Sequence, residues 1–155
     1  MQELLSVLVA WLSIGLGLPA DHGHPAIRRA STAEMTALRL DRAGGALARH
    51  VDVQVGGAAP SIHQAVLHAV YDDQTRTIYL ANEWTGATPA ESSILVHELV
   101  HHLQNVEGLT YDCPEAREKQ AYQAQARWLE LFGTSLSEEF GLDPMTLLVR
   151  TNCMH

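Results

Sequence analysis

The sequence has few of the residues that bind nucleic acids or attach a chain to a membrane surface. It carries 10 Lys and Arg against 18 Asp and Glu, a formal net charge of -8, and no cluster of basic residues. Phosphate contacts supply most nucleic-acid affinity, and anionic membranes attract basic segments. The composition therefore argues against DNA or RNA as a partner and against strong membrane binding.

Long hydrophobic runs are also missing, apart from one at the N-terminus. Residues 1–20 read MQELLSVLVAWLSIGLGLPA, and their apolar run is short for a membrane span and interrupted by Ser and Gly. A secretory signal would begin with basic residues, whereas this segment begins with Gln2 and Glu3. We expect residues 3–16 to form a helix of the core, with a cleaved signal segment as the alternative.

Cysteine is scarce as well, since the chain has only Cys113 and Cys153. In an exported protein these two would form a disulfide that ties the C-terminal tail to the start of a helix. In the cytoplasm they would be free thiols. The sequence leaves the compartment open, with a slight preference for the cytoplasm.

What the chain does contain is enough apolar sequence for a folded core. Its 155 residues are 46% hydrophobic and 18% charged, with no internal repeat and no low-complexity segment. This balance is typical of a globular protein, and the length favours a single domain. We expect one domain over residues 1–155, with its central part at about 64–132.

Local signals divide the chain into several helices and one small sheet. Capping boxes begin at Ser31 and Thr88. Pro89, Pro114 and Pro144 are typical of the first turn of a helix. A polar turn between two β-rich runs predicts a hairpin. Helices are expected at 3–16, 31–40, 89–106, 114–132 and briefly after 143–144, strands at 65–71 and 77–80, and a loop with one weak strand (51–55) at 41–63. The fold class is therefore α+β and mostly helical, with a small sheet just ahead of the helix at 89–106.

The predicted helix at 89–106 carries the most informative motif of the chain, H-E-x-x-H. It is formed by His97, Glu98 and His101. Residues i and i+4 of a helix lie on one face, so both imidazoles can bind one ion. Glu98 is rotated from His97 by about a hundred degrees, which lets it reach a water on that ion without binding the ion itself. This spacing is typical of a zinc site with an adjacent general base.

The remaining residues of this helix fit a site that faces away from the core. The apolar side chains fall on the side opposite the histidines, where they can pack. They are Leu95, Val96, Leu99, Leu103 and Val106. We expect the polar face to be directed into a cleft.

A catalytic zinc usually has three protein ligands, so a third ligand is required. The H-E-x-x-H-x-x-G-x-x-H pattern does not supply it, because Gln104 and Glu107 stand where that pattern has Gly and His. The next helix offers Glu118 at the start of an apolar stripe, where an unpartnered buried carboxylate would be costly. Glu115, one turn earlier, is the competing candidate, and the sequence leaves both open.

With these residues assembled, the chain resembles the gluzincins, in which H-E-x-x-H is followed by a Glu ligand on a second helix. The segment EKQAY is similar to the E-x-x-A-[DNY] pattern of small gluzincins, with Glu118 as the ligand and Tyr122 where Asp or Asn often stands. The segments VHELVHHLQ and AYQAQARWL are similar to small uncharacterised bacterial proteins with this minimal core. The resemblance covers about residues 64–132. It implies a minimal zincin core, one Zn²⁺ per chain and hydrolysis of peptide bonds.

Further polar residues could assist such a site. Gln104 lies on the same helical face and could orient a ligand or a water. Tyr111 and Tyr122 are candidate oxyanion donors, since a tetrahedral intermediate needs one besides the metal. We expect His102 to point away from the ion and to bond a neighbouring loop, and His68 to be a half-buried strand residue rather than a cleft residue.

The segment 76–84, RTIYLANEW, precedes the histidine-bearing helix. Edge strands can bind extended peptides through backbone pairing. In the peptidases that this chain resembles, an edge strand at this place binds extended substrate, so the resemblance implies that this segment is an edge strand that holds substrate. We expect Arg76 and Asn82 to be exposed turn residues.

Together these patterns predict a zinc metallopeptidase in which His97, His101 and Glu118 bind the metal. Glu98 would take a proton from the metal-bound water and pass it to the leaving amine. The expected partner is a peptide or protein substrate. Two alternatives remain: a zinc-containing binding or regulatory protein with weak catalysis, and a peptidase dedicated to one regulatory protein.

Overall fold

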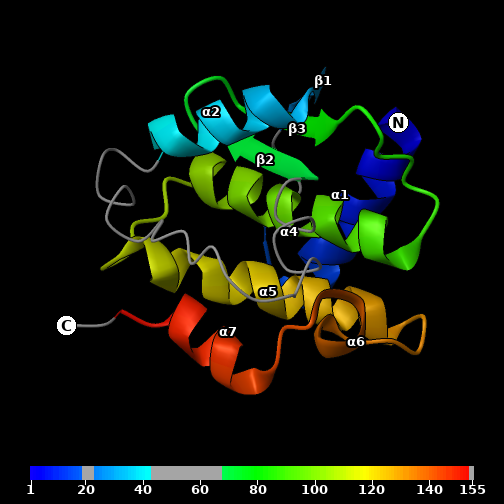
Figure 1. The fold of residues 1–155 in the computed structure, drawn as a ribbon, viewed down its shortest axis with the longest axis vertical. Helices are drawn as coiled ribbons and strands as arrows, with labels where there is room; N and C mark the ends of the chain where they lie inside the picture. The colour runs from blue at the N-terminus through cyan, green and yellow to red at the C-terminus, as the bar shows by residue number, and fades with distance from the viewer. Residues whose placement is uncertain (19–22, 43–67, 154–155) are drawn as a thin grey trace, which may run out of the picture.

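The protein has the mostly helical α+β fold that the sequence predicts (Figure 1). This structure is a computed structural model, and it describes residues 1–18, 23–42 and 68–153. Its elements are α1 (Gln2–Leu16), β1 (Ala26–Ala30), α2 (Thr32–Arg42), β2 (Ala69–Asp72), β3 (Thr77–Ala81), α4 (Pro89–Val106), α5 (Pro114–Glu130), α6 (Leu136–Phe140) and α7 (Pro144–Thr151).

The sheet has three strands in the order β1-β3-β2. The predicted hairpin is present, because β2 and β3 pair antiparallel around a turn at 73–76. Strand β1 pairs parallel with β3 and had not been predicted. Its sequence AIRRA is short and mostly exposed, so it gives little strand signal on its own.

The position of β3 corrects one prediction. Segment 76–84 was expected to contain an edge strand, but β3 pairs on both sides, with Tyr79 opposite Arg28 and Val70. Its backbone groups are therefore used within the sheet. Of the strands that the structure describes, the one at the edge next to the histidine-bearing helix is β2.

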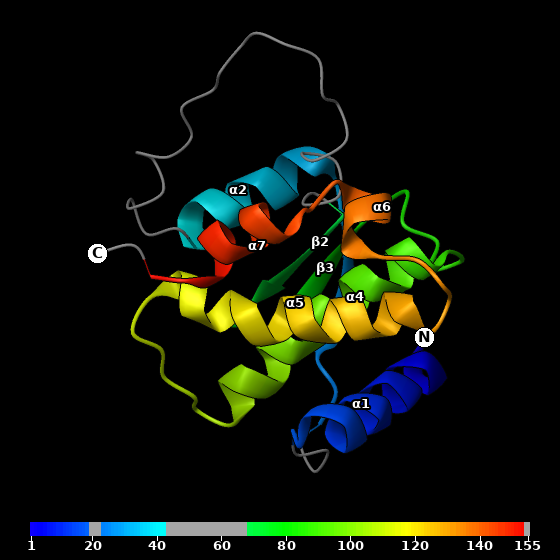
Figure 2. The same cartoon turned by 90° about the horizontal axis from the view of Figure 1, so that it is seen from below.

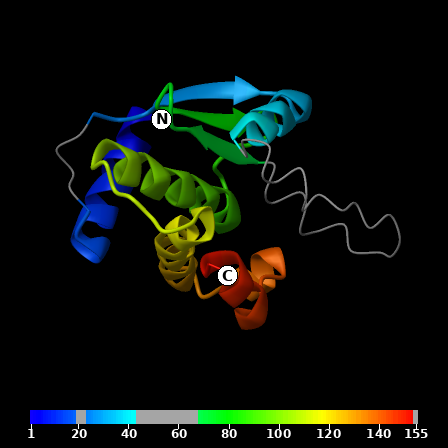
Figure 3. The ribbon, with the colours of Figure 1, turned by 90° about the vertical axis from the view of Figure 1, so that its left-hand side faces the viewer.

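Helix α4 lies in the middle of the molecule. Figure 3 shows the sheet, α4, α5 and then α6 with α7 as successive layers. Thr88 caps α4 by accepting from the backbone N–H of Glu91, as the capping box predicts. Every residue from 92 to 104 is buried, so the polar face packs inside the protein rather than facing open solvent.

Helix α1 contributes to the core, as expected of residues 3–16. Its buried side chains, Leu5, Leu8, Val9 and Leu12, lie on the side that packs against α4. Trp11 also contacts Trp128 of α5 edge to face, with ring centroids 5.3 Å apart. No helix in the described ranges is long and apolar enough to cross a membrane.

The C-terminal helices cover α5 from the side opposite α1 (Figure 2). A disulfide joins Cys113, the N-cap residue of α5, to Cys153 just after α7. The short helix α6 had not been predicted, and α5 ends at Glu130 rather than at 132. The weak strand predicted at 51–55 and the first residues of the strand predicted at 65–71 lie outside the described residues.

Candidate metal centre

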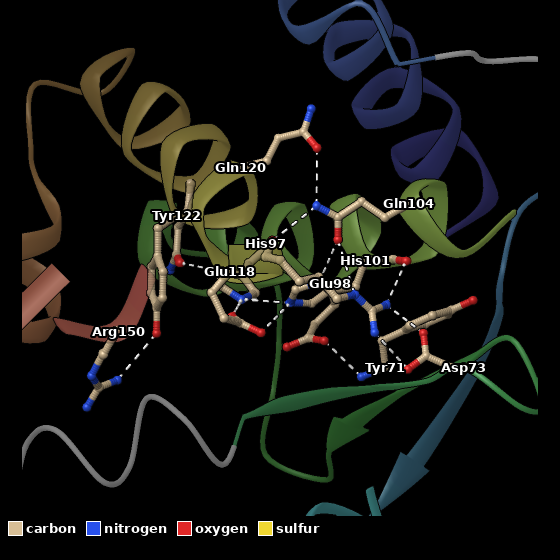
Figure 4. Close-up of polar contacts among 12 residues, drawn as sticks. Tyr71, Asp73, His97, Glu98, His101, Gln104, Glu118, Gln120, Tyr122 and Arg150 are labelled. Atoms are coloured by element: carbon tan, nitrogen blue, oxygen red, sulfur yellow. Dashed lines mark hydrogen bonds and ion pairs between the residues drawn. The ribbon is translucent and has the colours of Figure 1, made fainter. Parts of the chain in front are cut away.

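Three candidate ligands converge where α4 packs on α5 (Figure 4). His97 Nε2 lies 3.0 Å from Glu118 Oε2, and His101 Nε2 lies 3.3 Å from Glu118 Oε1. The two Nε2 atoms are 3.2 Å apart. Glu115, the competing candidate, is exposed and does not belong to this cluster.

The spacing of these atoms suits a tetrahedral ion. Zinc bonds of about 2.0–2.1 Å to nitrogen and oxygen place neighbouring ligand atoms about 3.3 Å apart. The separation of 3.2 Å between the two Nε2 atoms is close to that value, and each Nε2 lies 3.0 or 3.3 Å from one of the two oxygens of Glu118. Two imidazoles and one carboxylate are also a ligand set that catalytic zinc uses. The residues present therefore fit a zinc ion, which His97, His101 and Glu118 would hold.

The orientation of His97 is fixed by a chain of neutral hydrogen bonds. His97 Nδ1 donates to Gln125 Oε1 at 3.1 Å, and Gln125 Nε2 donates to Ser93 Oγ at 3.2 Å. Ser93 in turn donates to the carbonyl of Ala90. With Nδ1 donating to Gln125, Nε2 is the nitrogen that faces Glu118 at 3.0 Å, and in the neutral ring it is the atom that would bind an ion.

His101 is oriented in the same way, but its amide partner also contacts a charge. His101 Nδ1 donates to Gln104 Oε1 at 3.0 Å, and Arg117 Nε donates to the same oxygen at 3.2 Å. Arg117 forms an ion pair with Asp73 and donates to the carbonyl of His101. The predicted orienting role of Gln104 thus has a geometric basis, and Arg117 fixes Gln104.

The electrostatics of the cluster favour a positive charge at its centre. Burial lowers the pKa of His97, but the hydrogen bond and the charge of Glu118, with the charge of Glu98, raise it above its usual value. Burial raises the pKa of Glu118, yet the charges and hydrogen bonds of the two histidines bring it well below its usual range. A carboxylate held ionised beside two imidazoles is suited to a cation.

Glu98 lies beside the ligands and is held by the sheet. Its side chain is buried, and its Oε2 accepts the backbone N–H of Tyr71 at 2.8 Å. Tyr71 belongs to β2, so the edge strand positions this carboxylate. Among the described residues Oε1 has no hydrogen-bond partner. Glu98 can therefore accept a proton beside the cluster without being one of its three ligands.

The other predicted residues are divided between this site and the rest of the molecule. Tyr122 packs edge to face on His97, with ring centroids 4.7 Å apart. His102 donates to the carbonyl of Gly23, which confirms its predicted bond to a neighbouring loop. Tyr111 lines a separate cavity of about 430 Å³, which none of the cluster's ligands lines. His68 is half-buried, as expected, but it lies in a bend just before β2 rather than in the strand.

Sequence reasoning missed several residues that contact the site. Gln125 was not among the predicted site residues, although a buried Gln in a helix needs a hydrogen-bond partner. The link from Arg117 to Asp73 joins α5 to the hairpin turn, and no local pattern indicates it. Arg150 of α7 donates to Tyr122 Oη at 3.3 Å, a contact between segments distant in sequence.

The fold and this cluster define a small α+β protein that gathers two histidines and a glutamate between two central helices. The chain belongs to a family described as a domain of unknown function, DUF6647, whose model matches residues 1–155. The comparisons with curated proteins and with solved structures gave no match.

Proposed function

We propose that this protein is a zinc-dependent hydrolase, and specifically a metallopeptidase of gluzincin type. The observation that carries the proposal is the convergence of His97, His101 and Glu118, with both imidazole Nε2 atoms directed at one point. A cation bound between the two imidazoles would offset the charge of the ionised Glu118 carboxylate. Bound there, zinc would activate a water and polarise a carbonyl.

Glu98 is the general base in this proposal. Its Oε2 is anchored by the N–H of Tyr71, which leaves Oε1 to accept a proton from the attacking water. The same carboxylic acid then donates that proton to the leaving amine. The anchor on β2 matters because proton transfer requires a fixed distance between the carboxylate and the reacting atoms.

Peptides are the proposed substrate class for two reasons. The H-E-x-x-H and Glu118 arrangement resembles that of the gluzincins, which hydrolyse peptide bonds. In addition, β2 is the edge of the described sheet and adjoins α4, and an edge strand can bind an extended chain through backbone hydrogen bonds. We therefore assign the binding of an extended substrate to β2 and no longer to segment 76–84.

The test compares zinc-loaded wild type with Glu98→Gln and Glu115→Gln on a peptide library, with and without a chelator. We expect chelator-sensitive hydrolysis by wild type, and a loss of about a hundredfold or more in Glu98→Gln with zinc retained. Glu115→Gln removes an exposed acid of α5 and should change neither quantity. An active Glu98→Gln protein would contradict the mechanism, and zinc binding without turnover in wild type would favour a non-catalytic role.

A further inference from the structure

One cationic side chain next to the proposed site has most of its hydrogen-bonding capacity unused. Arg150 lies in the last turn of α7 and is half-buried. A guanidinium has five N–H donors. Within the described residues, Arg150 makes one hydrogen bond, from Nη1 to Tyr122 Oη, and no carboxylate lies within ion-pair distance of it.

The contrast with Arg117 shows why this is informative. Arg117 has its guanidinium bound to Asp73, to Gln104 and to the carbonyl of His101, through four hydrogen bonds in all. Arg150 has no comparable set of partners. The chain has a net charge of -8, yet within the described residues no carboxylate forms an ion pair with this arginine.

Two features place Arg150 near the candidate metal ligands. Tyr122, which accepts its hydrogen bond, packs on the ring of His97 (Figure 4). Cys153, just after α7, is joined by a disulfide to Cys113 at the start of the helix that carries Glu118. The end of α7 is thus covalently fixed to α5, and the guanidinium is held near the ligands.

We propose that Arg150 binds a carboxylate of the substrate, so that the protein selects anionic peptides. A planar guanidinium fork matches a carboxylate with two parallel N–H···O bonds. The carboxylate can belong to the C-terminus of the peptide or to an acidic side chain. This inference rests on the proposed function, because it takes the bound molecule to be a peptide substrate held at the proposed zinc site.

Binding and turnover are measured separately, so that the two proposals can fail separately. The probe is a set of synthetic hexapeptides, each made with Glu or Gln at one internal position and with a free or amidated C-terminus. Retention on immobilised, zinc-loaded Glu98→Gln protein is measured by mass spectrometry. Hydrolysis of the same set is measured with wild type.

We expect carboxylate peptides to be retained about tenfold or more over their uncharged partners. The Glu/Gln pairs and the acid/amide pairs show which carboxylate is recognised. Arg150→Ala, in the Glu98→Gln background, should lose this preference. Arg28→Ala, which removes an exposed arginine of β1, should keep it.

Equal retention of charged and uncharged peptides would overturn the inference, as would the absence of any retention or a preference that survives Arg150→Ala. Carboxylate-selective retention without hydrolysis by wild type would support Arg150 as a binding residue and would contradict the peptidase proposal. Circular dichroism of each variant establishes that it is folded.

Discussion

Helices α4 and α7 both place residues at the proposed site, but they are held in different ways. Every residue of α4 from 92 to 104 is buried between the sheet, α1 and α5. Helix α7 has no buried residue, and it presents Met145, Leu148 and Val149 to solvent. One helix is enclosed on several sides, whereas the other packs on α5 and is joined to it by a disulfide.

This difference matches the tasks of the two helices. His97, Glu98 and His101 must keep fixed distances from one another and from Glu118, and a closely packed interior resists displacement. Each of these polar groups also has a hydrogen-bond partner, which offsets the cost of burial. Arg150 has to meet a ligand that arrives from solvent, so a half-buried position suits it.

The largest expected effect comes from removing apolar contacts in α4. Leu99 is fully buried, and Leu99→Ala should lower the free energy of unfolding by about 2–5 kcal/mol. Leu148→Ala is the matched change in α7, where the side chain is 56% exposed, and it should cost less than about 0.5 kcal/mol. Chemical denaturation measures both. Equal costs would mean that α7 is packed as closely as α4.

Loss of the disulfide should affect α7 more than α4. The bridge joins residues 40 positions apart, and replacing both cysteines by Ser should cost about 2–4 kcal/mol. Hydrogen exchange should show amides of α7 losing protection first, while those of α4 stay protected. Carboxylate selectivity should fall as well, because Arg150 is no longer fixed. Unchanged protection in α7 would show that its surface contacts are sufficient.

A smaller effect is expected from the side chain that orients His101. Gln104→Leu keeps an uncharged side chain of similar length but removes the acceptor for His101 Nδ1. Zinc affinity should fall about 10–100-fold, as is typical when a ligand histidine loses its orienting partner. Gln123→Leu, at an exposed position of α5, is the control and should bind zinc like wild type. Competition with a coloured chelator gives both affinities.

The smallest effect is expected at the start of α4. Thr88 Oγ1 accepts the backbone N–H of Glu91 at 3.1 Å, and Thr88→Ala should cost about 1 kcal/mol. Zinc binding should be unaffected, because the cap is remote from the ligands along the helix. Thermal unfolding with and without zinc checks both statements. A loss of zinc affinity would mean that the entry to α4 helps to set the site geometry.

The same two helices indicate how far sequence alone could go. The cap of α4, its length and the shared face of His97 and His101 depend on near neighbours in sequence, and all three were predicted. The Pro after Asp143 likewise located α7. Residues within one or two turns of each other interact in the same way wherever the helix is placed, so such signals are reliable.

Contacts between distant segments could not be predicted in this way. The parallel pairing of β1 with β3 made β3 the central strand, and the sequence of segment 76–84 does not reveal how many neighbours it has. The bonds from His97 to Gln125 and from Arg150 to Tyr122 depend equally on packing. A five-residue helix such as α6 is also too short to show a periodic pattern.

The most direct test of the central proposal is zinc content, measured by mass spectrometry on wild type, Glu118→Ala and Glu115→Ala. The proposal predicts about one zinc per chain in wild type, loss of the metal in Glu118→Ala and retention in Glu115→Ala. Wild type that holds no zinc after incubation with the metal, or Glu118→Ala that holds it as tightly as wild type, would contradict a His97, His101 and Glu118 site.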